Sequence, residues 1–119
     1  MIELLEPFVK PNGKLIIGTR YAKEDNPPAE LIEFEGETLT LSAMNRIFRH
    51  CGYFITAMAG DSDREWERYI MWSARRNLEA LRAHPNDEEK RAWCDKWYDM
   101  YFGVRRAYEG YATFALERL

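Results

Sequence analysis

The sequence predicts an α/β fold, and two patterns support this prediction. First, an apolar helical segment at residues 1–9 reaches the turn Pro11-Asn12-Gly13 and leads directly into a strand at Lys14–Tyr21. Pro11 blocks the helix because it has no amide hydrogen, and we expect Gly13 to adopt the positive φ of a tight turn. Second, Leu15-Ile16-Ile17 are consecutive rather than alternating, which is typical of a strand that is covered on both faces and usually parallel.

The composition indicates a single domain spanning residues 1–119. Of the 119 residues 46% are hydrophobic, which is enough for one core but not for two. The net charge of −3 argues against electrostatic binding of nucleic acid, which needs a basic excess. No apolar run approaches the roughly 18 residues of a membrane helix and no signal-peptide pattern is present, so we expect neither a membrane protein nor a secreted one. Cys51 and Cys94 could form a disulfide, but reduced cysteines in a cytoplasmic protein are the favoured interpretation.

The segment after the first strand has no clear periodicity. Residues 22–30 contain Asn26-Pro27-Pro28 and several charges, which predicts a surface loop. Residues 30–38 allow two interpretations: Leu31, Ile32 and Phe34 could form a short extra strand or simply tuck into the core, and Gly36 breaks the segment. We expect Thr40 to cap the next helix, because its side-chain oxygen can accept a hydrogen bond from a free backbone amide.

Helical spacing then places apolar residues on one face of a helix, namely Leu41, Met44, Ile47, Phe48 and Cys51. Gly52 is expected to end this helix in a left-handed conformation, and a strand at Tyr53–Ala59 follows it. Beyond that strand the pattern becomes helical again until the last strand, Tyr111–Leu116, in which Ala112, Phe114 and Leu116 share one side.

The region between these two strands predicts a helical hairpin over about residues 61–108. Asp61, Ser62 and Asp63 can each cap its first helix, which is expected to run to about His84. Asn86 and the acidic residues after it are expected to start the second helix. Apolar stripes at helical spacing run along both helices, including Trp66, Tyr69, Ile70, Ala74, Leu78 and Leu81 on the first and Trp93, Trp97, Met100, Tyr101, Val104 and Tyr108 on the second.

Three segments resemble class I S-adenosylmethionine-dependent methyltransferases. LLEPFVKPNGKLIIGTRY, residues 4–21, is similar to the L-x-P-G-G-x-L segment that leads into the fifth strand of that family, with Asn12 in place of the first glycine. His50-Cys51-Gly52-Tyr53-Phe54 resembles the start of the sixth strand, and residues 109–116 resemble the seventh. The resemblance covers essentially the whole chain. The sequence lacks the glycine-rich loop after a first strand and the acidic residue that ends a second strand, with which the family binds its cofactor.

The resemblance therefore implies the C-terminal half of a methyltransferase. The expected fold is a partial Rossmann-like sheet in which strands similar to the fifth, seventh and sixth lie side by side in that order. The seventh would be antiparallel to both neighbours, and the helical hairpin would be inserted before it. S-adenosylmethionine is expected as a cofactor only if another chain completes the site, and no cofactor is expected for this chain alone.

Candidate site residues follow from the same resemblance. The loop after the fifth strand lies at the mouth of the active site in that family, which would place Arg20 and Tyr21 at its edge. The hairpin would cover the acceptor substrate with an aromatic stripe that includes Trp66, Tyr69, Trp72, Tyr98, Tyr101 and Tyr108. Aromatic faces can hold a cationic amine, and Arg105 could hold a carboxylate with two hydrogen bonds.

A simpler interpretation is available for each of these residues. Arg20 and Tyr21 can be a polar strand end, the tryptophans can be helix-packing residues, and Arg105 and Arg106 can face solvent; we favour these interpretations. No metal site is expected, because His50 and Cys51 would point to different sides of a helix and His84 is alone. The sequence assigns no catalytic residue.

A half of a sheet would leave one strand edge and one apolar face uncovered, so we expect a partner. It could be a second copy that pairs or exchanges strands, or a chain that carries the cofactor-binding half. The first functional hypothesis is the acceptor-substrate side of a small-molecule methyltransferase, inactive alone. The alternative is a non-enzymatic interaction or regulatory subunit derived from a methyltransferase, and a third possibility is an unrelated α+β domain whose similarity is accidental.

Overall fold

A computed structural model describes residues 5, 7 and 9–118. Its elements in chain order are β1 (Lys14–Ala22), α2 (Ala29–Glu35), α3 (Leu41–His50), β2 (Tyr53–Gly60), α4 (Asp63–Ala83), α5 (Glu88–Met100), the π-helical turn η2 (Tyr101–Arg105), α6 (Arg106–Tyr108) and β3 (Glu109–Arg118). The helix expected at residues 1–9 falls mostly outside the described residues.

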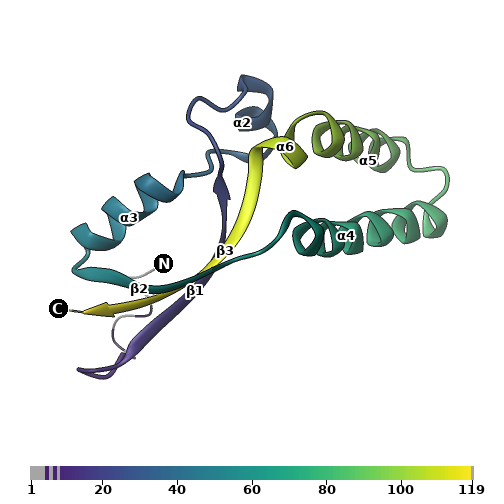
Figure 1. The fold of residues 1–119 in the computed structure, drawn as a ribbon. Coiled ribbons are helices and arrows are strands. Elements are labelled where there is room, and N and C mark those ends of the chain that lie inside the picture. Colours follow the sequence, from purple (N-terminus) through teal and green to yellow (C-terminus); the bar gives the residue numbers. More distant parts are fainter. Residues whose placement is uncertain (1–4, 6, 8, 119) are drawn as a thin grey trace.

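The three described strands form one sheet with the order β1-β3-β2. β3 is antiparallel to both neighbours and lies between them (Figure 1). Its pairing with β1 runs without interruption from Lys14–Glu117 to Ala22–Glu109, whereas its pairing with β2 shifts register between Ile55 and Ala57. This arrangement confirms the expected order of strands similar to the fifth, seventh and sixth, and with it the predicted fold class.

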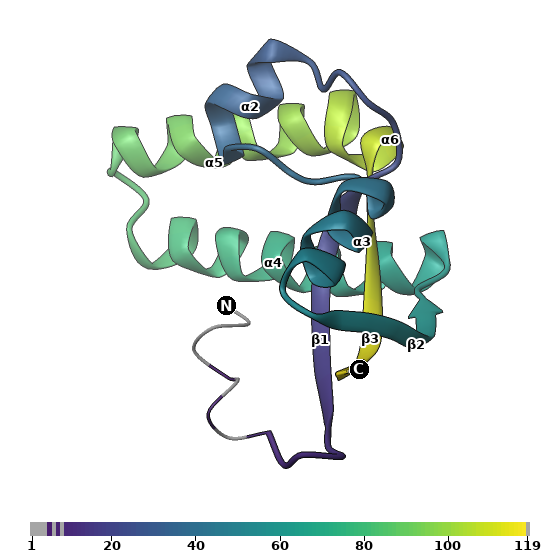
Figure 2. The ribbon, with the colours of Figure 1, turned by 90° about the vertical axis from the view of Figure 1, so that its left-hand side faces the viewer.

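One face of the sheet carries the main core. Alternate residues of β3, namely Ala112, Phe114 and Leu116, are buried there, as the sequence predicts. Leu15 and Ile17 of β1 join them, and α3 covers this face with Met44 and Phe48 (Figure 2). The rings of Phe48 and Phe114 meet edge to face with centroids 5.6 Å apart.

On the opposite face, α4 packs Trp66 against Tyr111 near the start of β3. Ile16 lies on that face and is 61% exposed, and Phe54 of β2 is also exposed. The expectation that the Leu15-Ile16-Ile17 run is covered on both faces and parallel to its neighbour is therefore wrong for this chain. The run alternates between a buried face and a bare one, and its hydrogen-bonded neighbour is antiparallel.

The α4–α5 hairpin projects from the end of the sheet (Figure 1), as the pattern of residues 61–108 predicts. Ser62 caps α4 by accepting a hydrogen bond from the Glu65 amide at 3.2 Å. Asp87, rather than Asn86, caps α5 by accepting one from the Lys90 amide at 3.0 Å. Between the helices, the core consists of Trp66, Ile70, Ala74, Trp97 and Tyr101.

The second helix of the hairpin contains a feature that the sequence pattern did not predict. At η2 the helix widens to a π turn, and the Arg106 amide donates its hydrogen bond to the Tyr101 carbonyl five residues earlier. As a result both Tyr101 and Arg105 point inward and are buried.

The segment after β1 is helical, and one turn differs from the prediction. Ala29–Glu35 form the helix α2 rather than a strand, and Leu31 is tucked into the core, as the second interpretation expects. Gly36 does end this segment, with φ of 81°. Gly13 does not adopt a positive φ; its amide instead closes a turn by donating to the Lys10 carbonyl at 2.8 Å.

Both ends of α3 are capped as the sequence predicts. Thr40 accepts a hydrogen bond from the Ala43 amide at 3.1 Å, and Gly52 follows the helix with φ of 86°. We expect Thr40→Ala to lower the free energy of unfolding by about 1 kcal/mol, because one free amide of the helix loses its partner. Urea denaturation followed by circular dichroism measures the change.

Ser42→Ala is the matched control for this cap. Ser42 lies in the first turn of the same helix and is exposed, so its replacement should change the free energy of unfolding by less than about 0.5 kcal/mol. Equal losses in the two variants would contradict the role of Thr40 as the cap.

The chain is more extended than its length requires. Its radius of gyration is 17.4 Å, whereas a compact domain of this length has about 13.5 Å. Its accessible surface is 8666 Å², against about 6,700 Å² expected for a folded monomer of this mass. The projecting hairpin and the bare sheet face account for this excess.

Candidate functional site

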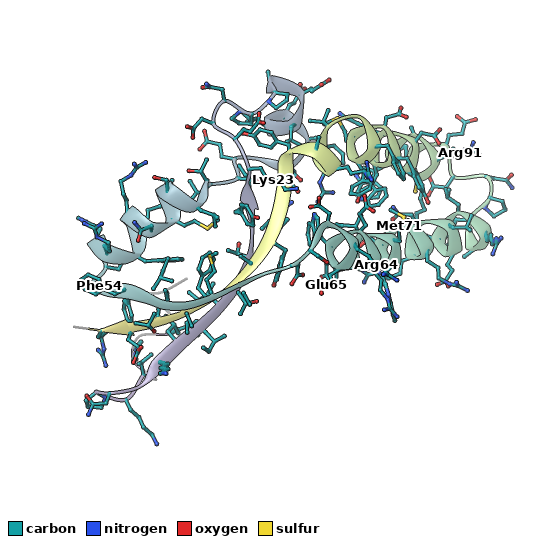
Figure 3. The ribbon with its side chains drawn as sticks, viewed as in Figure 1. Lys23, Phe54, Arg64, Glu65, Met71 and Arg91 are labelled. Atoms are coloured by element: carbon teal, nitrogen blue, oxygen red, sulfur yellow. The ribbon has the colours of Figure 1, made fainter. Side chains whose placement is uncertain are left out.

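The strongest candidate site lies at the end of the sheet where β1 and β2 finish. Both strands run antiparallel to β3, so their carboxyl ends lie at the same edge, where open α/β sheets bind ligands. The Lys23 amide donates to the Tyr108 carbonyl at 2.8 Å and the Asp61 amide donates to the Tyr111 carbonyl at 2.9 Å. These bonds fix both strand ends against the start of β3, and Figure 3 shows Lys23 at this junction.

An aromatic wall, consisting of Trp66, Tyr69 and Tyr111, stands at this edge. The Trp66 ring stacks on Tyr69 at 5.7 Å and on Tyr111 at 5.5 Å between centroids. Trp66 is only 5% exposed, but Tyr69 is 63% exposed and presents the wall to solvent. The Tyr111 ring lies over Gly18 of β1, since a Cβ placed on Gly18 would be 2.4 Å from the Tyr111 hydroxyl.

The structure thus brings together two of the predicted site residues, Trp66 and Tyr69. Trp72 lies one turn further along α4 and is strongly exposed, outside the wall. Tyr111 belongs to the wall although sequence reasoning did not single it out as a site residue. The only available signal was its position on the less buried side of the last strand.

A cavity of about 260 Å³ opens beside the aromatic wall, and we call it the α4–α6 cavity. Its lining residues are Lys23, Asp63, Trp66, Glu67, Arg106 and Ala107. Two ion pairs cross it: Lys23 Nζ lies 2.9 Å from Asp63 Oδ1, and the Arg106 guanidinium contacts the Glu67 carboxylate. The hydrogen bond from Lys23 lowers the pKa of Asp63, and the hydrogen bond to Glu67 raises the pKa of Arg106, so both shifts favour the charged forms of Asp63 and Arg106.

Beneath α2 lies a buried ionic cluster formed by Arg20, Glu35, Arg105 and Glu109. Glu35 Oε2 lies 2.8 Å from Arg20 Nη1 and 3.0 Å from Arg105 Nε. Glu109, which is fully buried, accepts a hydrogen bond from Arg105 Nε at 3.2 Å. Burial lowers the pKa of Arg105, while the Glu35 carboxylate acts in the opposite direction.

This cluster corrects the favoured interpretation of Arg105. Its side chain does not face solvent; the residue is 8% exposed and lies between two carboxylates. Arg20 is more exposed but is also paired with Glu35, so it is not simply a solvated arginine. Both arginines join α2 to the end of the sheet.

The other predicted residues make packing contacts and hydrogen bonds within the fold. The Tyr21 ring covers Gly110, where an added Cβ would lie 2.6 Å from the ring. Tyr108 is buried, and its hydroxyl donates to the Glu24 carbonyl. Tyr98 donates its hydroxyl hydrogen to the Ala74 carbonyl at 3.3 Å, which ties α5 to α4.

The described residues offer neither a metal-binding group nor a membrane-spanning helix. Residues 5, 7 and 9–118 hold no group of three or more His, Cys, Asp or Glu side chains placed to bind a metal ion. None of the helices among these residues is long and apolar enough to cross a membrane. Both Cys51 and Cys94 are free thiols, in agreement with the reduced state favoured from the sequence.

The segment that follows β1 does not resemble a nucleotide-binding turn. Such a site needs a glycine-rich turn between a strand and the N-terminus of a helix. β1 is instead followed by the loop with Pro27-Pro28 and by the seven-residue helix α2, whose first turn contains the acidic Glu30.

Three solved structures share the fold. Methyltransferases dependent on S-adenosylmethionine from Geobacter sulfurreducens and Thiobacillus denitrificans, both in complex with S-adenosyl-L-homocysteine, are 27% and 25% identical to this chain. YjhP from Escherichia coli is 27% identical. Each has a TM-score of 0.81 and covers 99% of this chain, while 51%, 51% and 55% of the three chains, respectively, are matched.

The chain therefore spans about half the length of the solved structures it matches. No protein-family model and no curated protein matches its sequence. The structural similarity over the whole chain excludes an accidental resemblance, and the strand order β1-β3-β2 agrees with that of the fifth, seventh and sixth strands. This chain has the fold of the C-terminal half of a class I S-adenosylmethionine-dependent methyltransferase.

Proposed function

We propose that this chain supplies the acceptor-substrate side of a small-molecule methyltransferase. The observation that carries the proposal is the aromatic wall of Trp66, Tyr69 and Tyr111 beside the α4–α6 cavity, at the carboxyl ends of β1 and β2. Aromatic faces attract cationic amines, and Tyr69 is accessible to one. Among the site residues predicted from the sequence, Trp66 and Tyr69 contact the acceptor in this proposal.

The other predicted residues have supporting roles. Arg20 and Arg105 hold α2 over the sheet end through the buried ionic cluster. Tyr21 and Tyr108 pack around the start of β3, and Trp72 extends the aromatic surface along α4. None of these five is proposed as a catalytic residue.

In this proposal the residues that bind the methyl donor are supplied by a cofactor-binding half that the described residues do not include. The bare sheet face, the free edge of β1 and the excess accessible surface are the features that a cofactor-binding half would cover. That half would be carried by a partner chain, or a second copy of this chain would cover the face by pairing or exchanging strands. S-adenosylmethionine would bind only in the completed assembly. The free thiols fit a cytoplasmic location.

The cofactor part of this proposal gives a direct prediction. Isothermal titration of the purified chain with S-adenosylmethionine should show no saturable binding at concentrations up to about 1 mM. The reason is that a strand with a glycine-rich turn and helix N-terminus is missing from the described residues. A dissociation constant in the micromolar range for the chain alone would contradict the need for a partner.

A non-enzymatic interaction module is the second candidate, because the same bare sheet face could serve any protein partner. Affinity purification with the tagged chain separates the two candidates. A partner that carries a glycine-rich cofactor-binding half, and that gains methyl-transfer activity when mixed with this chain, supports the enzyme. A stable complex with a partner that lacks such a half supports the interaction module.

A further inference from the structure

The lining of the α4–α6 cavity has equal numbers of opposite charges. Lys23 comes from the loop after β1, Asp63 and Glu67 come from the first two turns of α4, and Arg106 comes from α6. The two cations and two anions balance, and Trp66 provides an apolar side. A ligand that carries a single charge would leave one of these groups without its counter-ion.

A charged ligand can replace one partner in each ion pair of this cavity, because the paired side chains are partly exposed. The Asp63 side chain is 83% exposed and the Arg106 side chain is 58% exposed, so water already competes for both. The buried ionic cluster is different, because its carboxylates are almost completely withdrawn from solvent. A charged ligand could therefore replace a partner in the cavity at low cost.

A second and independent observation concerns Tyr101 of η2. Its hydroxyl is buried without a hydrogen-bond partner among the described residues, and the residue is only 1% exposed. Tyr101 packs in the same buried cluster as Trp66, which lines the cavity. Burial raises the pKa of its hydroxyl. A buried hydroxyl without a partner is unfavourable, and a polar ligand group could satisfy it.

We propose that the α4–α6 cavity binds a small zwitterion that carries both a carboxylate and an ammonium group, as a free amino acid does. The carboxylate would contact Lys23 and Arg106, and the ammonium would contact Asp63 and Glu67 beside the Trp66 ring. The volume of about 260 Å³ is below the usual range of roughly 300–1,000 Å³ for drug-sized ligands, which fits a molecule of this size. The inference rests on the proposed function, since it names the class of acceptor for the same site.

The test compares three probes of nearly equal shape: leucine, its amide, which is only a cation, and N-acetylleucine, which is only an anion. We expect leucine to bind the purified chain at least about tenfold more tightly than either singly charged probe. Heteronuclear NMR titration should show the largest shifts at the Lys23 amide and the Trp66 indole. Equal affinity for the three probes, preference for a singly charged probe, or no binding of leucine up to about 50 mM would overturn the proposal.

Substitutions inside and outside the cavity test where leucine binds. Glu67→Gln and Lys23→Gln should each weaken leucine binding several-fold while the circular dichroism spectrum stays unchanged. Arg91→Gln is the matched control, because Arg91 forms an exposed ion pair with Asp95 on α5, 3.2 Å apart, away from the cavity. Loss of binding in the control, or none in the two cavity variants, would place the ligand elsewhere.

The two proposals can fail separately. If leucine binds as expected but the completed assembly methylates no zwitterion, the cavity stands and the acceptor function is wrong. If the assembly methylates an acceptor of another class and leucine does not bind, the methyltransferase function stands and the inference about the cavity is wrong.

Discussion

Arg105→Ala is expected to lower the free energy of unfolding by about 3–5 kcal/mol, the usual cost of breaking a buried ion pair from one side. Arg105 lies between Glu35 and Glu109, at 3.0 and 3.2 Å from their carboxylates. Without it the fully buried Glu109 keeps only Arg20 nearby, at 3.9 Å. Urea denaturation followed by circular dichroism measures the loss, and α2 should also become more susceptible to proteolysis.

Two further variants isolate the cause. Arg106→Ala changes the neighbouring residue of the same type, whose side chain is largely exposed, and should have little effect on the free energy of unfolding. Arg105→Met keeps most of the side-chain volume but removes the charge, so it should be nearly as damaging as Arg105→Ala. Recovery of full stability in Arg105→Met would mean that packing, rather than charge, is what Arg105 contributes.

Ile16→Lys is expected to weaken association with the proposed partner by about 2 kcal/mol or more, which is about 30-fold or more in the dissociation constant. Ile16 is 61% exposed on the bare sheet face, on the strand that forms the sheet edge. A lysine there stays solvated in the free chain but must be desolvated when a partner covers it. Sedimentation of the assembly over a range of concentrations measures the change.

Ile47→Lys is the matched control for this interface. Ile47 is exposed on α3, which lies on the other face of the sheet, so the same substitution should leave association unchanged. The unfolding transitions of the two variants should differ little from that of the parent chain. A parent chain that is a single monomeric species at all concentrations, with no partner recovered from cells, would contradict the need for coverage.

Local patterns in the sequence were sufficient for most of the fold. The limits of β1 and β2, the Thr40 and Ser62 caps and the alternation within β3 depend on neighbouring residues, and the structure confirms them to within one residue. β3 itself extends two residues beyond the predicted Tyr111–Leu116 at each end. α2 was missed because a seven-residue helix is too short to show a clear period, and its Leu31 is held by contacts with distant residues. The apolar run alone could not predict that the sheet face carrying Ile16 is bare. The spacing of apolar residues in a strand does not show whether another element covers each face of the sheet.

The site was harder to predict than the fold. Trp66 and Tyr69 lie near each other because of helix geometry, so the sequence was enough for that pair. Tyr111 reaches them only through the antiparallel pairing of β3, and Lys23 reaches Asp63 only because β1 and α4 meet at the same edge. For Arg105, the four-residue spacing to Glu109 was an available signal of an ion pair, but its other partner, Glu35, lies in the helix that was missed.

The position of β3 has a consequence for how the protein is made. Both neighbours of this central strand, β1 and β2, precede it in the chain, and Lys14 pairs with Glu117 near the other end. During synthesis at the ribosome β1 and β2 cannot pair with β3 until residues 109–118 emerge. Folding that depends on such long-range closure is slow, and apolar strands left waiting are prone to aggregate. We therefore expect the nascent chain to depend on chaperones until its last strand is inserted.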